Sequence, residues 1–152
     1  MKLIAHRGLF EGPDKALENR PEQIKLALSK GFDAEVDVWY SRDTGFMLGH
    51  DHPSYQVTLE FLDNPGLWIH AKNLDALVLL QQRNVFWHED DAHTLTSRGF
   101  IWTSPGLGTA TASGILVMPE FAMHSGLDFS NIKHQSCYGV CSDYVQQIKE
   151  TL

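Results

Sequence analysis

Ile4-Ala5-His6-Arg7-Gly8 begins as a short apolar run and ends in an imidazole and a guanidinium group. Two later stretches, Glu35-Val36-Asp37-Val38 and Gly49-His50-Asp51, also place charged or imidazole side chains beside a short apolar run. Such a run predicts a buried strand, and its polar end predicts the mouth of a pocket. If the three strand ends meet, they bring two histidines, an arginine and two carboxylates to one place, which is a candidate active site.

The composition predicts one domain that spans residues 1–152. A chain of 152 residues with 43% hydrophobic residues can bury a sizeable core. The formal net charge of −7 argues against nucleic acid as a partner. A polyanionic substrate would therefore need local positive charge or a metal ion to offset the charge of the chain.

Targeting signals are not evident in the sequence. No apolar run approaches the roughly 20 residues that a transmembrane helix needs. The amino terminus reaches His6 too soon for the apolar region of a secretory signal peptide. Cys137 and Cys141 are the only cysteines, and we expect them as reduced thiols. These features predict a cytoplasmic protein without a transmembrane segment.

Apolar runs and turn signals predict eight short strands and four helices. The strands are expected at residues 2–5, 34–39, 46–49, 67–71, 85–87, 100–102, 115–118 and 138–141. The helices are expected at residues 21–30, 58–62, 74–82 and 144–149, with Asn19 as a candidate cap of the first. Between the second and third strands there is room only for an extended descent and a turn at Thr44-Gly45.

This order of elements predicts an α/β fold, specifically a compact (β/α)₈ barrel of the TIM type. Active sites of such barrels lie at the carboxyl ends of the strands, where this chain places its polar residues. These barrels usually have about 250 residues, so several helices must be reduced or missing here. Because parallel strands usually need long crossover connections, an open α/β sheet is the alternative.

The ordered motifs resemble those of the glycerophosphodiester phosphodiesterase family, which belongs to the phospholipase C-like phosphodiesterase superfamily. In the first third of the chain the resemblance rests on His6-Arg7-Gly8, Glu18-Asn19, Glu35-Val36-Asp37-Val38, Asp43-Thr44-Gly45 and Gly49-His50-Asp51. Further on, Ile69-His70-Ala71-Lys72 is similar to the family's fourth-strand Glu-x-Lys motif, with His70 in place of the glutamate. Trp102-Thr103 is similar to a late family motif, and residues 139–144 to its closing strand.

The resemblance implies a role for each matched residue. His6 and His50 would be the acid/base pair, and Arg7 and Lys72 would act in catalysis by binding the phosphate and neutralising its charge. Glu35 and Asp37 would ligate one divalent metal ion: Mg²⁺, Ca²⁺, Mn²⁺ or Zn²⁺. The third ligand would be His70, or else a carboxylate from Glu120 or Glu89. Trp102 would contact the substrate.

The chemistry of the residues supports a metal at the second strand. Glu35 and Asp37 are two apart, so on a strand they point to the same face. Two carboxylates on one inward face repel each other unless a cation or a proton joins them. The alternative is that both face solvent on an edge strand. His70 could ligate through a ring nitrogen, which favours zinc or manganese, or it could be a hydrogen-bonded core residue.

Alternatives also exist for the neighbouring groups. Arg7 could form a salt bridge with Glu18 or Glu35, because its planar fork suits carboxylates as well as phosphates. Histidine suits acid and base work because its pKa lies near neutrality. The run His88-Glu89-Asp90-Asp91 is more typical of a solvated loop than of a metal site.

These observations predict a metal-dependent phosphodiesterase that hydrolyses a phosphodiester of a small polyol or sugar. The main alternative is a non-catalytic protein that binds a sugar phosphate or a phospholipid headgroup at the same mouth. A different metal hydrolase that uses His70, His88 and Glu120, and a structural protein without activity, are further alternatives. A thin outer layer would leave apolar surface uncovered, so a homodimer is also expected.

Overall fold

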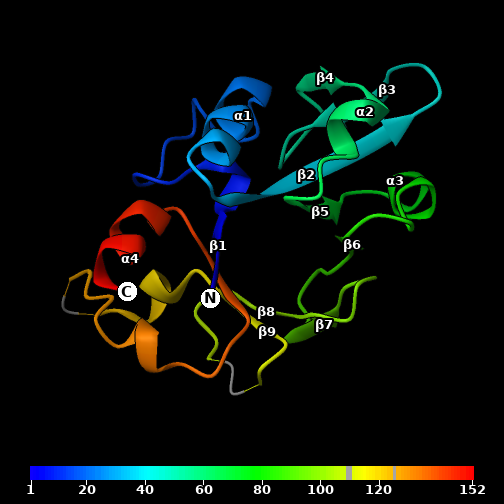
Figure 1. Ribbon diagram of the computed structural model, residues 1–152. Helices are drawn as coiled ribbons and strands as arrows, with labels where there is room; N and C mark the ends of the chain where they lie inside the picture. Colours follow the sequence, from blue (N-terminus) through cyan, green and yellow to red (C-terminus); the bar gives the residue numbers. More distant parts are fainter. Residues whose placement is uncertain (109–110, 125) are drawn as a thin grey trace.

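The computed structural model describes residues 1–108, 111–124 and 126–152 (Figure 1). Its strands are β1 (Lys2–Ala5), β2 (Asp33–Ser41), β3 (Gly45–Leu48), β4 (Tyr55–Val57), β5 (Leu67–Ala71), β6 (Val85–Phe86), β7 (His93–Leu95), β8 (Ile101–Thr103), β9 (Gly114–Val117) and β10 (Gly139–Ser142). Its α-helices are α1 (Pro21–Ser29), α2 (Leu59–Leu62), α3 (Leu74–Leu79) and α4 (Val145–Thr151). Three 3₁₀ turns complete the description: η1 (His6–Gly8), η2 (Pro119–Ala122) and η3 (Ile132–His134).

One mixed sheet contains all ten of these strands. β1 pairs in parallel with β2 on one side and with β10 on the other. Parallel pairing continues from β2 to β5 and β6, and from β10 to β9 and β8. β3 and β4 form an antiparallel extension beyond β2, and β7 pairs antiparallel with β8. The carboxyl ends of the parallel strands therefore lie at one edge of the sheet.

The sheet is not closed in the part of the chain that the structure describes. β6 and β8 are the last parallel strands on either side, and no strand pairing joins them. They are only two and three residues long, and the link between them contains β7 instead of a helix. The α/β class is confirmed, whereas a closed eight-stranded barrel is not. An open sheet describes the hydrogen-bonded arrangement.

The core lies on both faces of the curved sheet because side chains alternate along each strand. On β2, Ala34, Val36 and Val38 join one buried cluster with residues of α1, α2, α3 and β5. The interior face carries a second cluster from six strands and the residue after β9: Ile4, Trp68, Phe86, Trp102, Ile115, Val117, Met118 and Cys141. α4 and η3 cover the outer face of β9 and β10. Glu35 and Asp37 thus fall on the interior side of β2.

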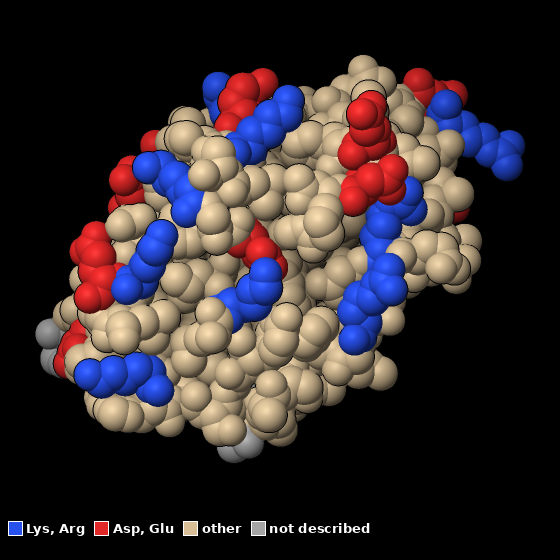
Figure 2. All heavy atoms as spheres, viewed as in Figure 1, with Lys and Arg blue, Asp and Glu red and all other residues tan. Residues whose placement is uncertain are grey.

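The helices are short. Within the described residues, none has the length and apolar character needed to cross a membrane. Figure 1 shows β1 near the centre of the molecule, with α1 above it and α4 to its left. On the face drawn in Figure 2, positive and negative side chains are interspersed and form no continuous basic stripe among the residues drawn in colour.

Candidate active site

Three side chains of two neighbouring strands meet at the carboxyl edge of the sheet. Glu35 and Asp37 come from β2, and His70 comes from β5, where it is the register partner of Asp37. One ligand atom from each of the three lies within 4.8 Å of the others, and all three residues are buried. The prediction that Glu35 and Asp37 share an inward face is confirmed, and the solvent-facing alternative is wrong.

Asp37 is the most connected residue of the group. Its Oδ2 accepts a hydrogen bond from Asn19 Nδ2 at 2.9 Å and lies 3.4 Å from Arg7 Nε. Its Oδ1 lies 3.1 Å from His70 Nδ1 and 3.7 Å from Lys72 Nζ, yet it has no hydrogen-bond partner among the described residues. Burial raises the pKa of the Asp37 carboxyl, but His70, Arg7 and Lys72 outweigh burial and hold that pKa well below its usual range. Asp37 therefore remains ionised inside the molecule.

Glu35 lies in the same buried space but has fewer partners. Its Oε2 accepts a hydrogen bond from the backbone N–H of Arg7 at 3.0 Å. Burial, followed by the negative charge of Asp37, raises the pKa of the Glu35 carboxyl. The pair thus favours the arrival of a proton or a cation, which is what two carboxylates on one inward face require.

The turn after β1 is shaped by Gly8 and Arg7. Gly8 has φ +81, and a Cβ there would lie 3.0 Å from the Ile24 side chain, so this position requires glycine. Arg7 also has a left-handed backbone, with φ 50. This conformation directs the Arg7 backbone N–H to Glu35, while its guanidinium Nη1 bonds Glu18 Oε2 at 3.0 Å. The bridge to Glu18 that the sequence left open is present.

Asn19 connects this turn to β2. It has φ 57, and its backbone N–H donates to the Arg7 carbonyl at 2.9 Å. Its side-chain Oδ1 accepts from the Asp37 backbone N–H at 2.9 Å, while Nδ2 donates to the Asp37 carboxylate. The prediction that Asn19 caps the first helix is wrong, because Arg20 occupies the cap position of α1. The buried amide instead holds Asp37 in place.

His6 is fixed from the opposite side of the mouth. Its Nδ1 bonds Asp143 Oδ1 at 2.8 Å, and Asp143 directly follows β10, the parallel neighbour of β1. Burial lowers the pKa of His6, but the hydrogen bond to Asp143 and the charge of Glu35 outweigh it and raise the pKa above its usual value. This bond fixes the ring and leaves Nε2 for proton exchange.

His50 lies at the rim. A Cβ on Gly49, which has φ +148, would collide with the His52 carbonyl, so the sharp turn before His50 requires glycine. The Gly49 N–H donates to the Asp37 carbonyl at 3.1 Å, which places this turn beside β2. His50 itself bonds the exposed Asp51 and lines a separate hollow that also touches Glu18 and Asn19.

Of the remaining predicted site residues, one lies at the site, one in the core and one in an exposed loop. Lys72 directly follows β5 and belongs to the group around Asp37. Trp102 is buried in the interior cluster, 4.5 Å between ring centroids from Phe86, so its position gives no support to substrate binding. Glu89 is exposed in the loop after β6. Neither Glu89 nor Glu120 joins the only described group of three residues that could hold a metal.

Glu120 instead borders a hollow of about 450 Å³ beside His6. Its Oε1 accepts hydrogen bonds from Ser142 Oγ at 2.8 Å and from the Asp143 backbone N–H at 3.3 Å. Apolar residues complete the wall: Pro13, Pro105, Met118, Phe121, Leu127 and Tyr144. A ligand bound at His6 and Arg7 would extend into this hollow.

His70 belongs to a group of three nearly parallel rings with Phe86 and His88. Its ring centroid lies 5.2 Å from that of Phe86 and 4.6 Å from that of His88, with nearly parallel planes. Burial, then the charge of His70, lowers the pKa of His88. His88 thus packs beside the His70 ring, and the grouping of His70, His88 and Glu120 as a metal site is not found among the described residues.

Sequence reasoning missed Asp143 as the partner of His6, and it misjudged Asn19. The only signal for Asp143 was its place directly after an apolar strand, the same signal that identified His6. Comparisons of the chain with models of protein families, with curated proteins and with solved structures give no match. The resemblance to glycerophosphodiester phosphodiesterases therefore rests on the motifs alone.

Proposed function

We propose that this protein is a metal-dependent phosphodiesterase that hydrolyses a phosphodiester of a small polyol or sugar. The observation that carries the proposal is the buried Oδ1 of Asp37, which has no hydrogen-bond partner among the described residues and belongs to the group with Glu35 and His70. Two carboxylates and one imidazole suit manganese or zinc better than calcium. A cation held by these three residues would place positive charge near the phosphoryl oxygens and lower the pKa of a bound water.

The side chains around this group fit the other needs of phosphodiester hydrolysis. Arg7 and Lys72 approach Asp37 from two elements and could contact two phosphoryl oxygens of a substrate. His6, held by Asp143, can exchange a proton through Nε2 with the attacking or the leaving oxygen. The hollow beside His6 offers room for the polyol or sugar.

The fold is consistent with an incomplete barrel. From β6 through β5, β2, β1, β10 and β9 to β8, the parallel strands follow the circular order of the chain. That order is the one found in a (β/α)₈ barrel, and it brings the strand ends of β1, β2, β5 and β10 together. We infer a barrel-like fold interrupted between β6 and β8.

A non-catalytic role is the second candidate, and the charges around Asp37 favour it. Arg7 and Lys72 already offset the two carboxylates, and His70 adds a third group beside Asp37. With this compensation the mouth could be stable without a metal and could bind the phosphate of a sugar phosphate or lipid headgroup through Arg7 and Lys72.

Titration calorimetry with Mn²⁺, Zn²⁺, Mg²⁺ and Ca²⁺ tests the metal site. We expect saturable binding that is abolished by Asp37→Asn and retained by Asp43→Asn, which neutralises an exposed carboxylate in the turn before β3. The metal-loaded parent should then hydrolyse bis(p-nitrophenyl) phosphate, and Asp37→Asn should not.

The outcomes separate the two candidates. Metal binding without hydrolysis of any phosphodiester tried would contradict the enzyme proposal. Binding of a sugar phosphate without metal, unchanged in His6→Ala and His50→Ala but lost in Arg7→Gln, would establish the binding protein instead.

A further inference from the structure

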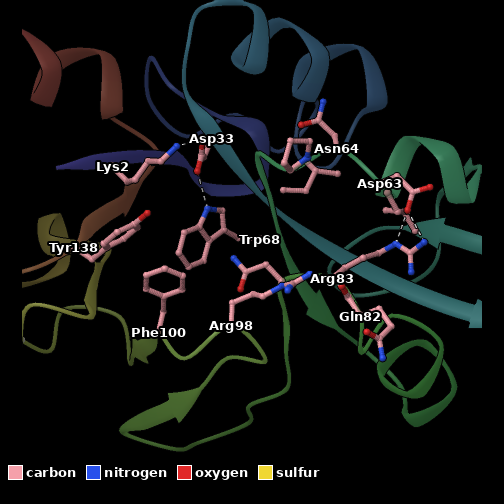
Figure 3. Close-up of a pocket in the computed structure, with 14 residues that line it drawn as sticks. Lys2, Asp33, Asp63, Asn64, Trp68, Gln82, Arg83, Arg98, Phe100 and Tyr138 are labelled. Atoms are coloured by element: carbon pink, nitrogen blue, oxygen red, sulfur yellow. Dashed lines mark hydrogen bonds and ion pairs between the residues drawn. The ribbon is translucent and has the colours of Figure 1, made fainter.

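A hollow of about 590 Å³ lies at the amino ends of the strands (Figure 3). Its lining includes the first residues of β1 and β2, Lys2 and Asp33, and residues that directly precede β8 and β10, Phe100 and Tyr138. Because these strands run in parallel, the hollow is at the end of the sheet opposite to the candidate active site. It is therefore a separate place in the molecule, and nothing in the proposed function uses it.

The position of the hollow follows from the open side of the sheet. Arg83 lies two residues before β6, and Arg98 lies three residues before β8, which are the two parallel strands that do not pair with each other. On this side the lining includes the polar residues Gln82, Arg83, Asn84 and Arg98. Figure 3 shows Lys2 and Tyr138 on one side of the hollow, Arg83 on the other, and Trp68 between them.

The charges in this wall are not balanced. Asp33 accepts from Lys2 Nζ and from Trp68 Nε1, both at 3.0 Å, so each of its two carboxylate oxygens has a donor. Asp63 Oδ1 accepts from Arg83 Nε at 2.9 Å and also bonds Arg83 Nη2.

Arg98 has no ion-pair partner among the described residues. Its Nη2 donates to the Gln82 carbonyl, which keeps the guanidinium at the edge of the hollow. The lining thus contains one more cation than it has carboxylates, on a chain with net charge −7.

An aromatic wall stands beside these cations. Ring centroids are 4.3 Å apart for Phe100 and Tyr138, and 5.1 Å apart for Trp68 and Phe100. Trp68 is only 3% exposed, whereas Phe100 and Tyr138 are partly exposed and present ring surface to the hollow. A flat ring of a ligand can stack on such a surface, and a guanidinium with unused N–H groups suits a phosphate or carboxylate group.

We propose that this hollow binds a small aromatic anion of the mononucleotide class, in which a planar ring lies against Phe100 and Tyr138 and a phosphate contacts Arg98 and Arg83. Its volume falls within the range of small-molecule sites, about 300–1,000 Å³. Structural stability accounts for the Lys2–Asp33–Trp68 contacts, whereas the positive charge of Arg98 has no carboxylate partner among the described residues.

Calorimetry of the full chain with AMP, in the presence of EDTA at low ionic strength, tests the proposal. Adenosine and inorganic phosphate are the two partial probes. We expect one AMP site, with at least about tenfold weaker binding of either partial probe, because each lacks one half of the recognition. Arg98→Gln should weaken AMP binding about tenfold through loss of a charged hydrogen bond. Arg42→Gln, which neutralises an exposed arginine in the turn after β2, should leave it unchanged.

Three outcomes would overturn the proposal. Inorganic phosphate that binds as tightly as AMP would show that the ring contributes nothing to recognition. AMP binding that is lost in Lys72→Gln but kept in Arg98→Gln would place the nucleotide at the carboxyl end of the strands. Absence of AMP binding in the parent would contradict the proposal that the hollow binds a mononucleotide. Arg98 is exposed, so its replacement does not threaten the fold.

Discussion

His6 and His50 each follow a strand and each bond an aspartate at 2.8 Å, but one pair is enclosed and the other lies at the surface. The side chains of His6 and its partner Asp143 are 16% and 8% exposed. Those of His50 and its partner Asp51 are 37% and 72% exposed. The His50–Asp51 bond therefore stabilises the protein less than the His6–Asp143 bond. Water competes with an exposed ion pair, and the surrounding protein does not hold its geometry.

The origin of the difference is the number of elements that hold each histidine. His6 lies between β1, its parallel neighbour β10 and the carboxylate of Glu35, so three strands determine its surroundings. His50 follows a single antiparallel strand, and its partner is its neighbour in the chain. We infer that His6 has a preorganised ring, whereas His50 can change its orientation when a ligand arrives.

The largest expected effect is on hydrolysis by the metal-loaded protein. His6→Gln should lower kcat about 10²–10⁴-fold, because it removes a positioned acid or base. His50→Gln should lower kcat only about tenfold, because at an exposed rim a water can carry the proton in its place. Steady-state kinetics with bis(p-nitrophenyl) phosphate compares the two variants directly.

Equal losses in these two variants would break the comparison. That result would mean that the turn at His50 closes onto the substrate and makes both histidines equal partners. Metal affinity, measured by calorimetry, serves as the control, since neither histidine belongs to the group formed by Glu35, Asp37 and His70.

A smaller effect is expected on stability from the amide that holds Asp37. Asn19→Ala removes two buried hydrogen bonds to Asp37, and we expect it to lower the free energy of unfolding by about 1–3 kcal/mol. The matched control is Asn131→Ala, which changes an exposed asparagine whose side chain makes no capping bond. Urea unfolding of parent and variants measures the difference; equal stability of both variants would show that water replaces the amide.

The sequence allowed the strand ends to be predicted but not the contacts that fix them. His6 and Lys72 follow apolar strands. Glu35, Asp37 and His70 lie within strands beside apolar residues, and parallel pairing of β1, β2 and β5 brings the five residues together. Asn19 and Asp143 act across 18 and 137 positions of the chain, so no local pattern could identify their partners.

The sequence also did not allow us to predict whether the sheet closes into a barrel. The predicted strands at 85–87 and 100–102 exist as β6 and β8, but closure depends on pairing between them. The segment between them could have formed a helix that packs on the sheet. It instead contains β7, which pairs with β8, and among the described residues the only hydrogen bonds that join β6 to this hairpin are those between Val85 and Ser97 in the turn. Such a competition between local pairings is decided by tertiary packing.

The smallest expected effect concerns Asp143 and Asp51, the partners of the two histidines. Replacing them should change the free energy of unfolding differently as the pH varies. The pKa of His6 is raised in the folded state, so its charged form stabilises the fold below the ordinary value of 6.5. This stabilisation disappears as the pH rises through the folded pKa. Asp143→Asn should therefore reduce the free energy of unfolding by about 1 kcal/mol near about pH 5.5, and by clearly less near about pH 8.5.

Asp51→Asn is the matched control at the exposed pair, and it should leave the unfolding free energy unchanged at both values of pH. A histidine titration followed by NMR supplies an independent test, since Asp143→Asn should lower the pKa of His6 by removing the carboxylate that supports its charged form. A pH-independent loss of stability in Asp143→Asn would mean that the carboxylate of Asp143 accepts its hydrogen bond from His6 whether or not the imidazole is charged. In that case His6 would be positioned by the hydrogen bond and not by charge, and the contrast with His50 would be one of burial alone.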